Sequence, residues 1–152
     1  LPLGATGQAL PPDGAPPRSR SAHPALPILV VGAHMSGMAL NGELAALGAR
    51  LAKAVRTAPC YRLFRLPGEP ARPGLVRVRA GGGSVAAEVW TIPAAAVGAF
   101  LAKVPAPLAI GTVELDDGGR VHGFVCEAAA AEGAEDITAL GGWRNYVARG
   151  TM

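Results

Sequence analysis

The sequence predicts an α+β domain, with a small, strongly bent antiparallel β-sheet or barrel and two or three flanking helices. Runs of strand length outnumber helical patterns, and one pair of runs is joined by a clear hairpin turn. The 21 glycines and 14 prolines among 152 residues favour many turns and short elements over a helical bundle. Half of the residues are hydrophobic but only 5% are aromatic, so Ala, Val and Leu must fill the core of a chain whose length fits one domain.

The chain divides into a tail and a domain. Residues 1–26 are rich in Gly, Pro, Ala and Ser, and they are predicted to form a linker or disordered tail. Residues 27–150 hold the periodic apolar runs and are predicted to form the domain. Because the chain starts at Leu1 rather than at Met, we expect it to be a piece of a longer protein.

The first element of the domain is a strand that leads into a glycine-rich loop and then into a helix. Residues 28–31 are apolar and lie between Pro27 and Gly32, which predicts a short buried strand. Asn41 is a good N-cap for the helix that follows, and Gly48 is placed to end it. Such a loop can bind a small anion, since glycines let a ligand approach the backbone and the free N–H groups at the start of the helix favour negative charge. The alternative of equal weight is a tight turn that needs two glycines and nothing more.

Strands and turns continue along the rest of the chain. The predicted elements are two extended runs within 49–66 that break at 58–60, a strand over 75–79, a strand over 85–92, a helix over 93–103, a hairpin of 110–115 with 120–127, and a last helix from Asp136 to about 147. Gly81–Ser84 is predicted to be a hairpin connection. Asp116–Gly119 is the clearest turn signal in the sequence, whereas Gly141 and Gly142 weaken the middle of the last helix.

Composition and motifs exclude several function classes. The net charge is only +3, basic residues are scattered and aromatic residues are few, so we expect no nucleic-acid partner. No apolar run reaches the roughly 18–20 residues of a membrane helix, so no membrane partner is expected. Phosphate-loop and dinucleotide motifs are absent, and neither Cys60 nor Cys126 lies at metal-ligand spacing from a His, so we expect no cofactor and no metal. The two cysteines are interpreted as reduced, mostly buried thiols of a cytoplasmic protein.

His34 is the residue best placed for chemistry. An imidazole can accept or deliver a proton near pH 7, and only this one of the three histidines lies in a loop suited to ligand approach. His23 falls in the tail, and His122 falls on a predicted strand where it is expected to face solvent. A packing or hydrogen-bonding role for His34 is the alternative. Ser36 is predicted to be an anion-binding hydroxyl rather than a nucleophile, because its surroundings differ from the GxSxG elbow.

The stretch GAHMSGMALN (32–41) resembles the signature of the C-terminal domain of allophanate hydrolase, the enzyme that finishes ATP-dependent urea breakdown. Three further stretches agree with it, in the order of the family: RTAPCYRLFRLPGEPARPGLVRV (56–78), IGTVELDDGGRVHGFVCE (110–127) and DITALGGWRNYVA (136–148). The resemblance spans about residues 26–149. It implies a gamma-glutamylcyclotransferase-like fold, in which the loop after the first strand lines a small-molecule pocket.

The resemblance also implies a substrate and roles for site residues. The family's amidase domain releases ammonia from allophanate and leaves N-carboxycarbamate, a small dicarboxylate that the C-terminal domain is expected to carry on to ammonia and carbon dioxide. His34 is then the catalytic acid–base residue. Arg77 is the expected carboxylate clamp, with Arg62 and Arg56 as alternatives. The expected substrate-binding residues are Gly32, Ala33, Met35, Ser36, Gly37 and Arg77. The general-base carboxylate of the cyclotransferases has no counterpart in 93–105, so that reaction is not expected.

Two other functions stay open. One is a non-catalytic module that holds an amidase dimer or a multi-enzyme complex together, for which Trp143–Val147 offers an apolar stretch, although a helix packed on its own sheet explains that stretch more simply. The other is a standalone domain that binds a small dicarboxylate. The expected partners are the small dicarboxylate, the N-terminal amidase domain of the same enzyme and, as an alternative, a second copy in a homodimer.

Overall fold

The structure is a computed structural model that describes residues 24–150. Its elements are β2 (Ala25–Val30), α2 (Asn41–Ala46), β3 (Arg50–Arg56), β4 (Tyr61–Leu66), β5 (Arg72–Arg77), β6 (Ala86–Pro93), α3 (Ala94–Ala102), β7 (Leu108–Glu114), β8 (Arg120–Cys126), α4 (Ala128–Ala131), β9 (Glu135–Asp136), the 3₁₀ helix η1 (Thr138–Leu140) and α5 (Trp143–Gly150). β2 begins shortly before the predicted domain boundary at residue 27. Residues 1–23 of the predicted linker lie outside the described part of the chain.

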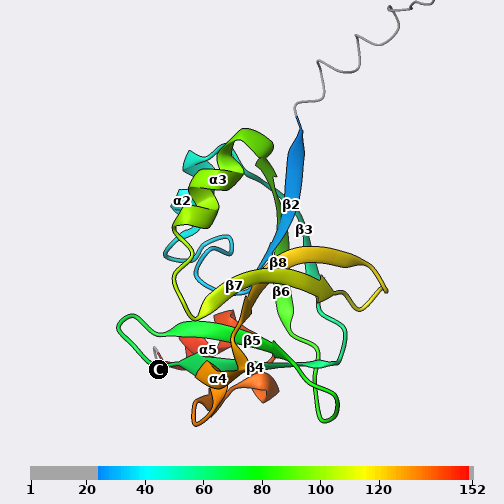
Figure 1. Cartoon of the computed structure of the whole chain (residues 1–152). Helices are drawn as coiled ribbons and strands as arrows, with labels where there is room; N and C mark the ends of the chain where they lie inside the picture. The colour runs from blue at the N-terminus through cyan, green and yellow to red at the C-terminus, as the bar shows by residue number, and fades with distance from the viewer. Residues whose placement is uncertain (1–23, 151–152) are drawn as a thin grey trace, which may run out of the picture.

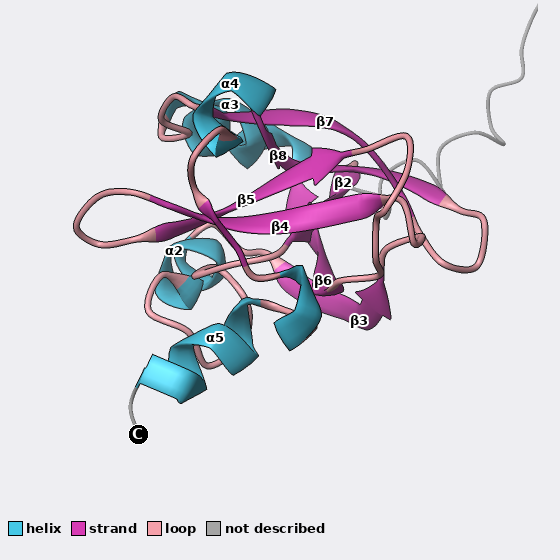
Figure 2. Cartoon of the chain, turned by 90° about the horizontal axis from the view of Figure 1, so that it is seen from below, coloured by secondary structure: helices cyan, strands magenta, loops and turns pink. Residues whose placement is uncertain are grey.

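The strands form two sheets. The larger has the order β3-β6-β2-β8-β7, and the smaller has the order β5-β4-β9. Figure 1 shows α2 and α3 together at one end of the larger sheet, with the smaller sheet, α4 and α5 at the other end. From below, β4 and β5 lie in front of the strands of the larger sheet (Figure 2). The core is therefore shared by two sheets and a few short helices.

β2 occupies the middle of the larger sheet. It pairs antiparallel with β6 and parallel with β8. Ile28, Leu29 and Val30 are at most 1% exposed, as expected for a short apolar strand with neighbours on both edges. Because both edges of β2 are hydrogen-bonded, the strand fixes the start of the loop 32–40, which lies on the side that carries α2 and α3 (Figure 1).

The buried residues come from both sheets. Leu63 and Leu75 of the smaller sheet and Ile92 and Val113 of the larger sheet are at most 1% exposed. Cys126 is buried and Cys60 is partly buried, and both are free thiols. Along residues 24–150, no helix combines the length and apolar character needed to span a membrane.

The predicted fold class is confirmed, with one difference in strand direction. The β2–β8 pair is parallel, and the sheets do not close into a barrel within the described residues. The predicted hairpin is present as β7 and β8. Gly118 takes a left-handed φ of 90° in its turn, and the side chain of Asp117 accepts the Gly119 N–H at 2.8 Å, which is the local chemistry that made the turn predictable.

Three local predictions are wrong. Gly81–Ser84 is not a hairpin connection, because β5 and β6 belong to different sheets. The last helix is replaced by β9, η1 and α5, since Gly141 takes a φ of 87° and ends η1. Asn41 does not cap α2, because it lies inside the helix and its side-chain nitrogen donates to the carbonyl of His34 at 2.8 Å.

Candidate functional site

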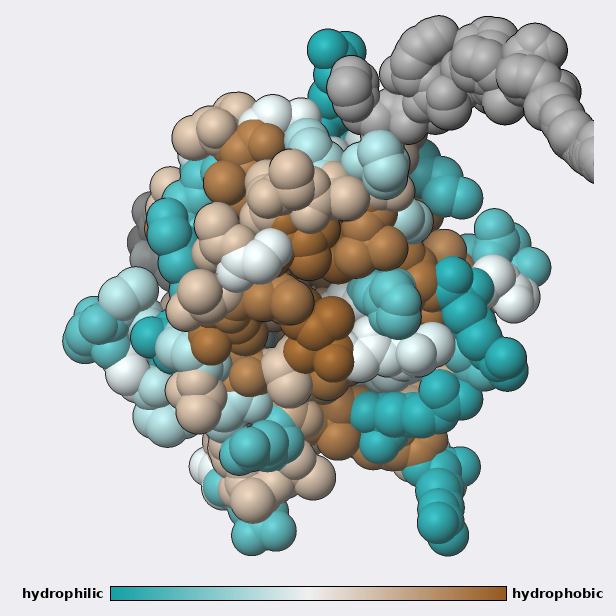
Figure 3. Space-filling model, turned by 45° about the horizontal axis from the view of Figure 1, so that its top comes forward, coloured by the Kyte–Doolittle hydropathy of each residue, from teal (hydrophilic) through white to brown (hydrophobic). Residues whose placement is uncertain are grey.

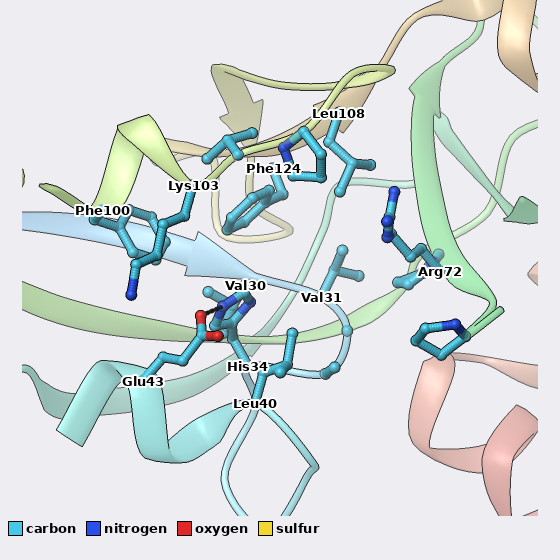
Figure 4. Close-up of a pocket in the computed structure, with 16 residues that line it drawn as sticks. Val30, Val31, His34, Leu40, Glu43, Arg72, Phe100, Lys103, Leu108 and Phe124 are labelled. Atoms are coloured by element: carbon cyan, nitrogen blue, oxygen red, sulfur yellow. Dashed lines mark hydrogen bonds and ion pairs between the residues drawn. The ribbon is translucent and has the colours of Figure 1, made fainter. Parts of the chain in front are cut away.

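A pocket of about 250 Å³ opens between the end of β2, the helices α2 and α3, and the start of β5 (Figure 4). Figure 3 shows apolar side chains gathered on the face of the molecule that carries α3. The pocket is lined by Val30, Val31, Gly32, Ala33, His34, Leu40, Glu43, Pro70, Arg72, Pro73, Phe100, Lys103, Val104, Pro105, Leu108 and Phe124. Most of these residues are apolar, and the few ionisable ones therefore decide which ligand the pocket can hold.

Neighbours hold the His34 side chain on three sides. Its Nε2 lies 3.1 Å from Oε1 of Glu43 in α2. Its ring stacks on Phe124, with centroids 5.5 Å apart, and meets Phe100 edge-on at 5.7 Å. A carboxylate only accepts hydrogen bonds, so Nε2 carries the hydrogen and Nδ1 is the ring nitrogen left for a ligand. The side chain remains 18% exposed, so a ligand in the pocket could reach it.

The turn at Ala33 and His34 offers main-chain donors. The Met35 N–H donates to the Gly32 carbonyl across this turn, at 3.0 Å. The carbonyl of Ala33 accepts from the Leu40 N–H at 2.8 Å. The N–H groups of Ala33 and His34 themselves have no acceptor within residues 24–150. Two residues of the pocket wall therefore have N–H groups without an acceptor in the described part of the chain. At the start of α2, where the sequence predicts free donors, the N–H groups of Asn41 and Glu43 instead donate to the carbonyls of Met38 and Leu40.

Two basic side chains stand at the mouth of the pocket. Arg72 begins β5 and Lys103 follows α3, and Figure 4 shows them on opposite sides. Both residues are exposed, and neither has an ion-pair partner in the described part of the chain. The acid among the lining residues is Glu43. Two positive charges against one negative charge favour an anionic ligand.

The structure distributes the predicted loop residues between the pocket and other places. Gly32 and Ala33 line the pocket. Met35 is a core side chain with 1% exposure. Gly37 is exposed, with a φ of 79°, so its role is to turn the chain.

Ser36 does bind a carboxylate, as predicted for an anion-binding hydroxyl, but this carboxylate is the side chain of Glu88 and not a ligand. Its N–H donates to Oε1 of Glu88 and its hydroxyl to Oε2, both at 2.7 Å. Trp90 Nε1 donates to Oε1 at 3.0 Å, and Arg144 lies 3.4 Å from Oε2. Burial raises the pKa of Glu88, but these hydrogen bonds outweigh it and hold the pKa below the ordinary value of 4.5.

Arg77 does not line the pocket. It forms an ion pair with Glu114 at 2.9 Å, and its side chain is 53% exposed. The hydrogen bond from Arg77 is the largest influence on Glu114 and helps to hold the pKa of this carboxyl below its ordinary value. The two alternative arginines also bind elsewhere: Arg62 pairs with Asp136, and Arg56 donates to the Ser84 carbonyl.

Four polar residues of this region escaped the sequence reasoning. Glu43 belongs to α2 and Lys103 directly follows α3, and charged side chains at such positions usually indicate only a solvated face. Arg72 stands within the quoted stretch 56–78, so the resemblance covered it without singling it out. Glu88 did carry a signal, because an acid in the middle of an apolar strand requires buried donors.

Comparison with known proteins identifies the family. Residues 26–148 match the family described as the allophanate hydrolase C-terminal domain. The chain belongs to this family. Urea amidolyase of Saccharomyces cerevisiae is 39% identical over 147 residues, which cover 93% of this chain and 8% of that protein. Urea amidolyase of Lachancea kluyveri is 38% identical over 125 residues, covering 79% of this chain and 7% of that protein. This allophanate hydrolase C-terminal domain thus spans less than a tenth of the curated relatives that it matches.

Solved structures agree with this assignment. The crystal structure of Kluyveromyces lactis urea amidolyase has a TM-score of 0.79 at 37% identity, covering 83% of this domain and 8% of that chain. The structure of c4763, a uropathogenic E. coli-specific protein, has a TM-score of 0.77 at 37% identity, covering 82% of this domain and 97% of that chain. A gamma-glutamyl cyclotransferase has a TM-score of 0.52 at 10% identity, and this likeness shows the fold alone.

Proposed function

We propose that this domain binds N-carboxycarbamate, the dicarboxylate left when an amidase releases ammonia from allophanate, and assists its decarboxylation. The observation that carries the proposal is the position of His34, in a small apolar pocket with unpaired basic side chains at its mouth. In this proposal the domain acts in cytoplasmic urea degradation, after the N-terminal amidase domain of the same enzyme. It needs no cofactor, because proton delivery and carboxylate binding are within reach of side chains and backbone.

The proposed step is a proton transfer coupled to the loss of carbon dioxide. The His34 imidazolium delivers a proton to the central nitrogen while the bond from this nitrogen to one carboxylate carbon breaks. The electron pair of that bond stays on nitrogen, and the carboxylate leaves as CO2. The remaining carbamate takes up a second proton in the same way and yields ammonia and CO2. With Nε2 bonded to Glu43, Nδ1 is the atom through which the proton passes.

The carboxylate clamp is proposed at Arg72 rather than Arg77. Arg72 lines the pocket and is unpaired in the described part of the chain, whereas Arg77 is neutralised by Glu114 outside the pocket. A guanidinium matches a carboxylate with two parallel hydrogen bonds. Lys103 supplies a second positive charge from the opposite side, and the free N–H groups of the turn supply donors for the retained carboxylate.

The apolar wall also supports this reaction. Phe124 and Leu108 present hydrocarbon to the ligand. A carboxylate placed against hydrocarbon loses hydration, whereas CO2 is uncharged and loses little. The wall therefore disfavours the carboxylate that must leave and accommodates the product, which lowers the barrier in the direction of decarboxylation.

One observation favours a second candidate function. The domain covers 97% of the c4763 chain, so a related protein consists almost entirely of this fold. A standalone domain that binds a small dicarboxylate is therefore the second candidate. A third function, in which the last helix only joins subunits, is less well supported. Trp143 is only 4% exposed and stacks on Tyr146, so it offers little surface to a partner. A homodimer stays a prediction.

The test supplies the domain in trans. An allophanate-hydrolysing amidase without this domain turns over ¹³C-labelled allophanate, and rapid quench with ¹³C detection follows the intermediate. We expect the wild-type chain to shorten the lifetime of N-carboxycarbamate and His34→Ala to lose about 10²–10⁴-fold of that acceleration, down to the spontaneous decay. His122→Ala, on β8 outside the pocket, is the matched control and should act like wild type.

Two outcomes would contradict catalysis. Full acceleration by His34→Ala would leave this histidine without a role in the step. Binding of malonate by a wild-type chain that gives no acceleration would favour the standalone binding domain instead.

A further inference from the structure

Glu88 is a buried carboxylate whose hydrogen bonds converge on the loop that carries His34. It lies in the middle of β6, between apolar neighbours, and is 5% exposed. A charge removed from water needs hydrogen-bond donors in its place. Four donors meet this carboxylate, and they come from Ser36, Trp90 and Arg144.

Two of these donors belong to Ser36, which follows His34 closely in the loop. Arg144 of α5 adds a further link, because it reaches Oε2 of Glu88 and also donates to the main-chain carbonyl of Ser36 at 2.5 Å. Ser36 is therefore held by its N–H, its carbonyl and its hydroxyl together.

These contacts are the polar links from the loop 32–40 to the sheet and to α5 in the described part of the chain. Its other hydrogen bonds stay within the loop or reach α2, as those of His34 with Asn41 and Glu43 do. The register places Val30, the last residue of β2, opposite Glu88. The loop thus leaves the sheet beside this carboxylate and is tied back to the same carboxylate at Ser36.

We propose that Glu88 is a positioning residue for His34, which fixes the loop so that the imidazole lies against Phe124 in the pocket wall. This inference rests on the proposed function of His34 and extends it to a group that does not line the pocket. The ionised carboxylate suits this role, because it accepts from all four donors at once. Trp90 and Arg144 hold the carboxylate, and the carboxylate holds Ser36.

The decisive variant is Glu88→Gln. It keeps the shape of the side chain but replaces one acceptor oxygen by an NH2 donor. This NH2 group would face either the N–H groups of Ser36 and Trp90, or Arg144 and a Ser36 hydroxyl that must turn round to accept. We expect the loop to shift and the ¹H–¹³C resonances of the His34 ring, which the currents of the Phe124 ring displace, to move toward those of exposed His122. In the trans assay we expect the acceleration to fall by up to about 100-fold, because a displacement of about 1 Å in a reacting group can cost that much.

Glu114→Gln is the matched control. It removes the same charge from a carboxylate that is also bonded by arginines, but on β7 and outside the pocket. This variant should leave the His34 resonances and the acceleration at wild-type values. A role of Glu88 in stability alone would make the two variants alike, so the comparison separates positioning from general stabilisation.

The proposal is overturned if folded Glu88→Gln has the His34 resonances and the acceleration of Glu114→Gln. Should Glu88→Gln not fold, Ser36→Ala removes only the hydroxyl donor to Glu88, and unchanged His34 resonances in that variant overturn the proposal as well. Failure of the proposed function has a different signature, in which His34→Ala keeps the full acceleration. The imidazole spectrum then still decides whether Glu88 orients His34.

Discussion

The imidazole of His34 lies nearly parallel to the ring of Phe124, with 5.5 Å between the ring centroids and 11° between the planes. Phe100 meets both rings edge-on, at 5.7 Å from each. The three rings form one cluster in the pocket wall. A residue proposed to act on a ligand therefore also contributes to packing.

His34→Ala is expected to lower the free energy of unfolding by about 1–2 kcal/mol, because it removes two aromatic contacts and leaves Phe124 less covered. Urea denaturation followed by Trp fluorescence measures the change. His122→Ala removes an exposed imidazole and should stay within about 0.5 kcal/mol of wild type. An equal effect of the two substitutions would show that the ring cluster adds no stability.

Arg72→Gln is expected to weaken the binding of malonate, a stable mimic of N-carboxycarbamate with carbon in place of the central nitrogen. Loss of a charge-assisted hydrogen bond should raise the Kd by about tenfold or more, as calorimetric titration can measure. Arg79→Gln removes the same charge from an exposed arginine outside the pocket and should leave the Kd unchanged. Equal Kd values for the two variants would place the ligand away from Arg72.

Gly32→Ala is expected to destabilise the domain by about 1–3 kcal/mol and to weaken malonate binding. A Cβ at this position would overlap the ring of Pro73, and both residues line the pocket. Gly42→Ala in α2 is the matched control, because its Cβ would meet open space. That substitution should be neutral or stabilise by about 0.5–1 kcal/mol, since alanine favours a helix. Thermal unfolding of both variants tests the contrast.

Glu88 is expected to make the stability of the domain sensitive to acid. Its pKa in the folded protein lies below 4.5, its ordinary value, so the unfolded chain takes up a proton more readily. Its contribution is therefore fully present above pH 4.5 and is lost as the pH falls through the folded pKa. Urea denaturation at neutral and at acidic pH should show a smaller loss of stability in Glu88→Gln than in wild type. An equal loss in both proteins would contradict this assignment.

The parts of the fold that depend on residues close together in the sequence could be predicted. The β7–β8 hairpin follows from the Asp117–Gly119 turn, and the buried β2 strand follows from four apolar residues before Gly32. The parallel β2–β8 pair could not be predicted, because it joins segments far apart in the chain. The prediction that Asn41 caps α2 failed for a related reason, since its side chain donates to the His34 carbonyl instead.

In the candidate site, too, the features set by local sequence could be predicted and those set by distant contacts could not. Local composition indicated His34, which lies in the pocket wall, but it placed the free N–H groups at the start of α2, where Asn41 and Glu43 in fact donate to carbonyls of the loop. Strand alternation placed Arg77 on the face of buried Leu75, but Arg77 ends β5 and reaches solvent. Arg72, at the opposite end of that strand, faces the pocket instead, and only the packing of β5 against the loop decides between the two ends.

The hydrogen bond from Arg144 to the Ser36 carbonyl joins residues 108 positions apart. During synthesis the loop is made first and Glu88 follows. Arg144 is made only with α5, the final helix of the described part of the chain. The sheet around β2 can assemble from residues already synthesised by the time β8 emerges, whereas the loop still lacks one of its anchors. A nascent chain should therefore acquire its sheet before its ligand site, because the loop gains its last anchor, and the core gains Trp143, only with α5.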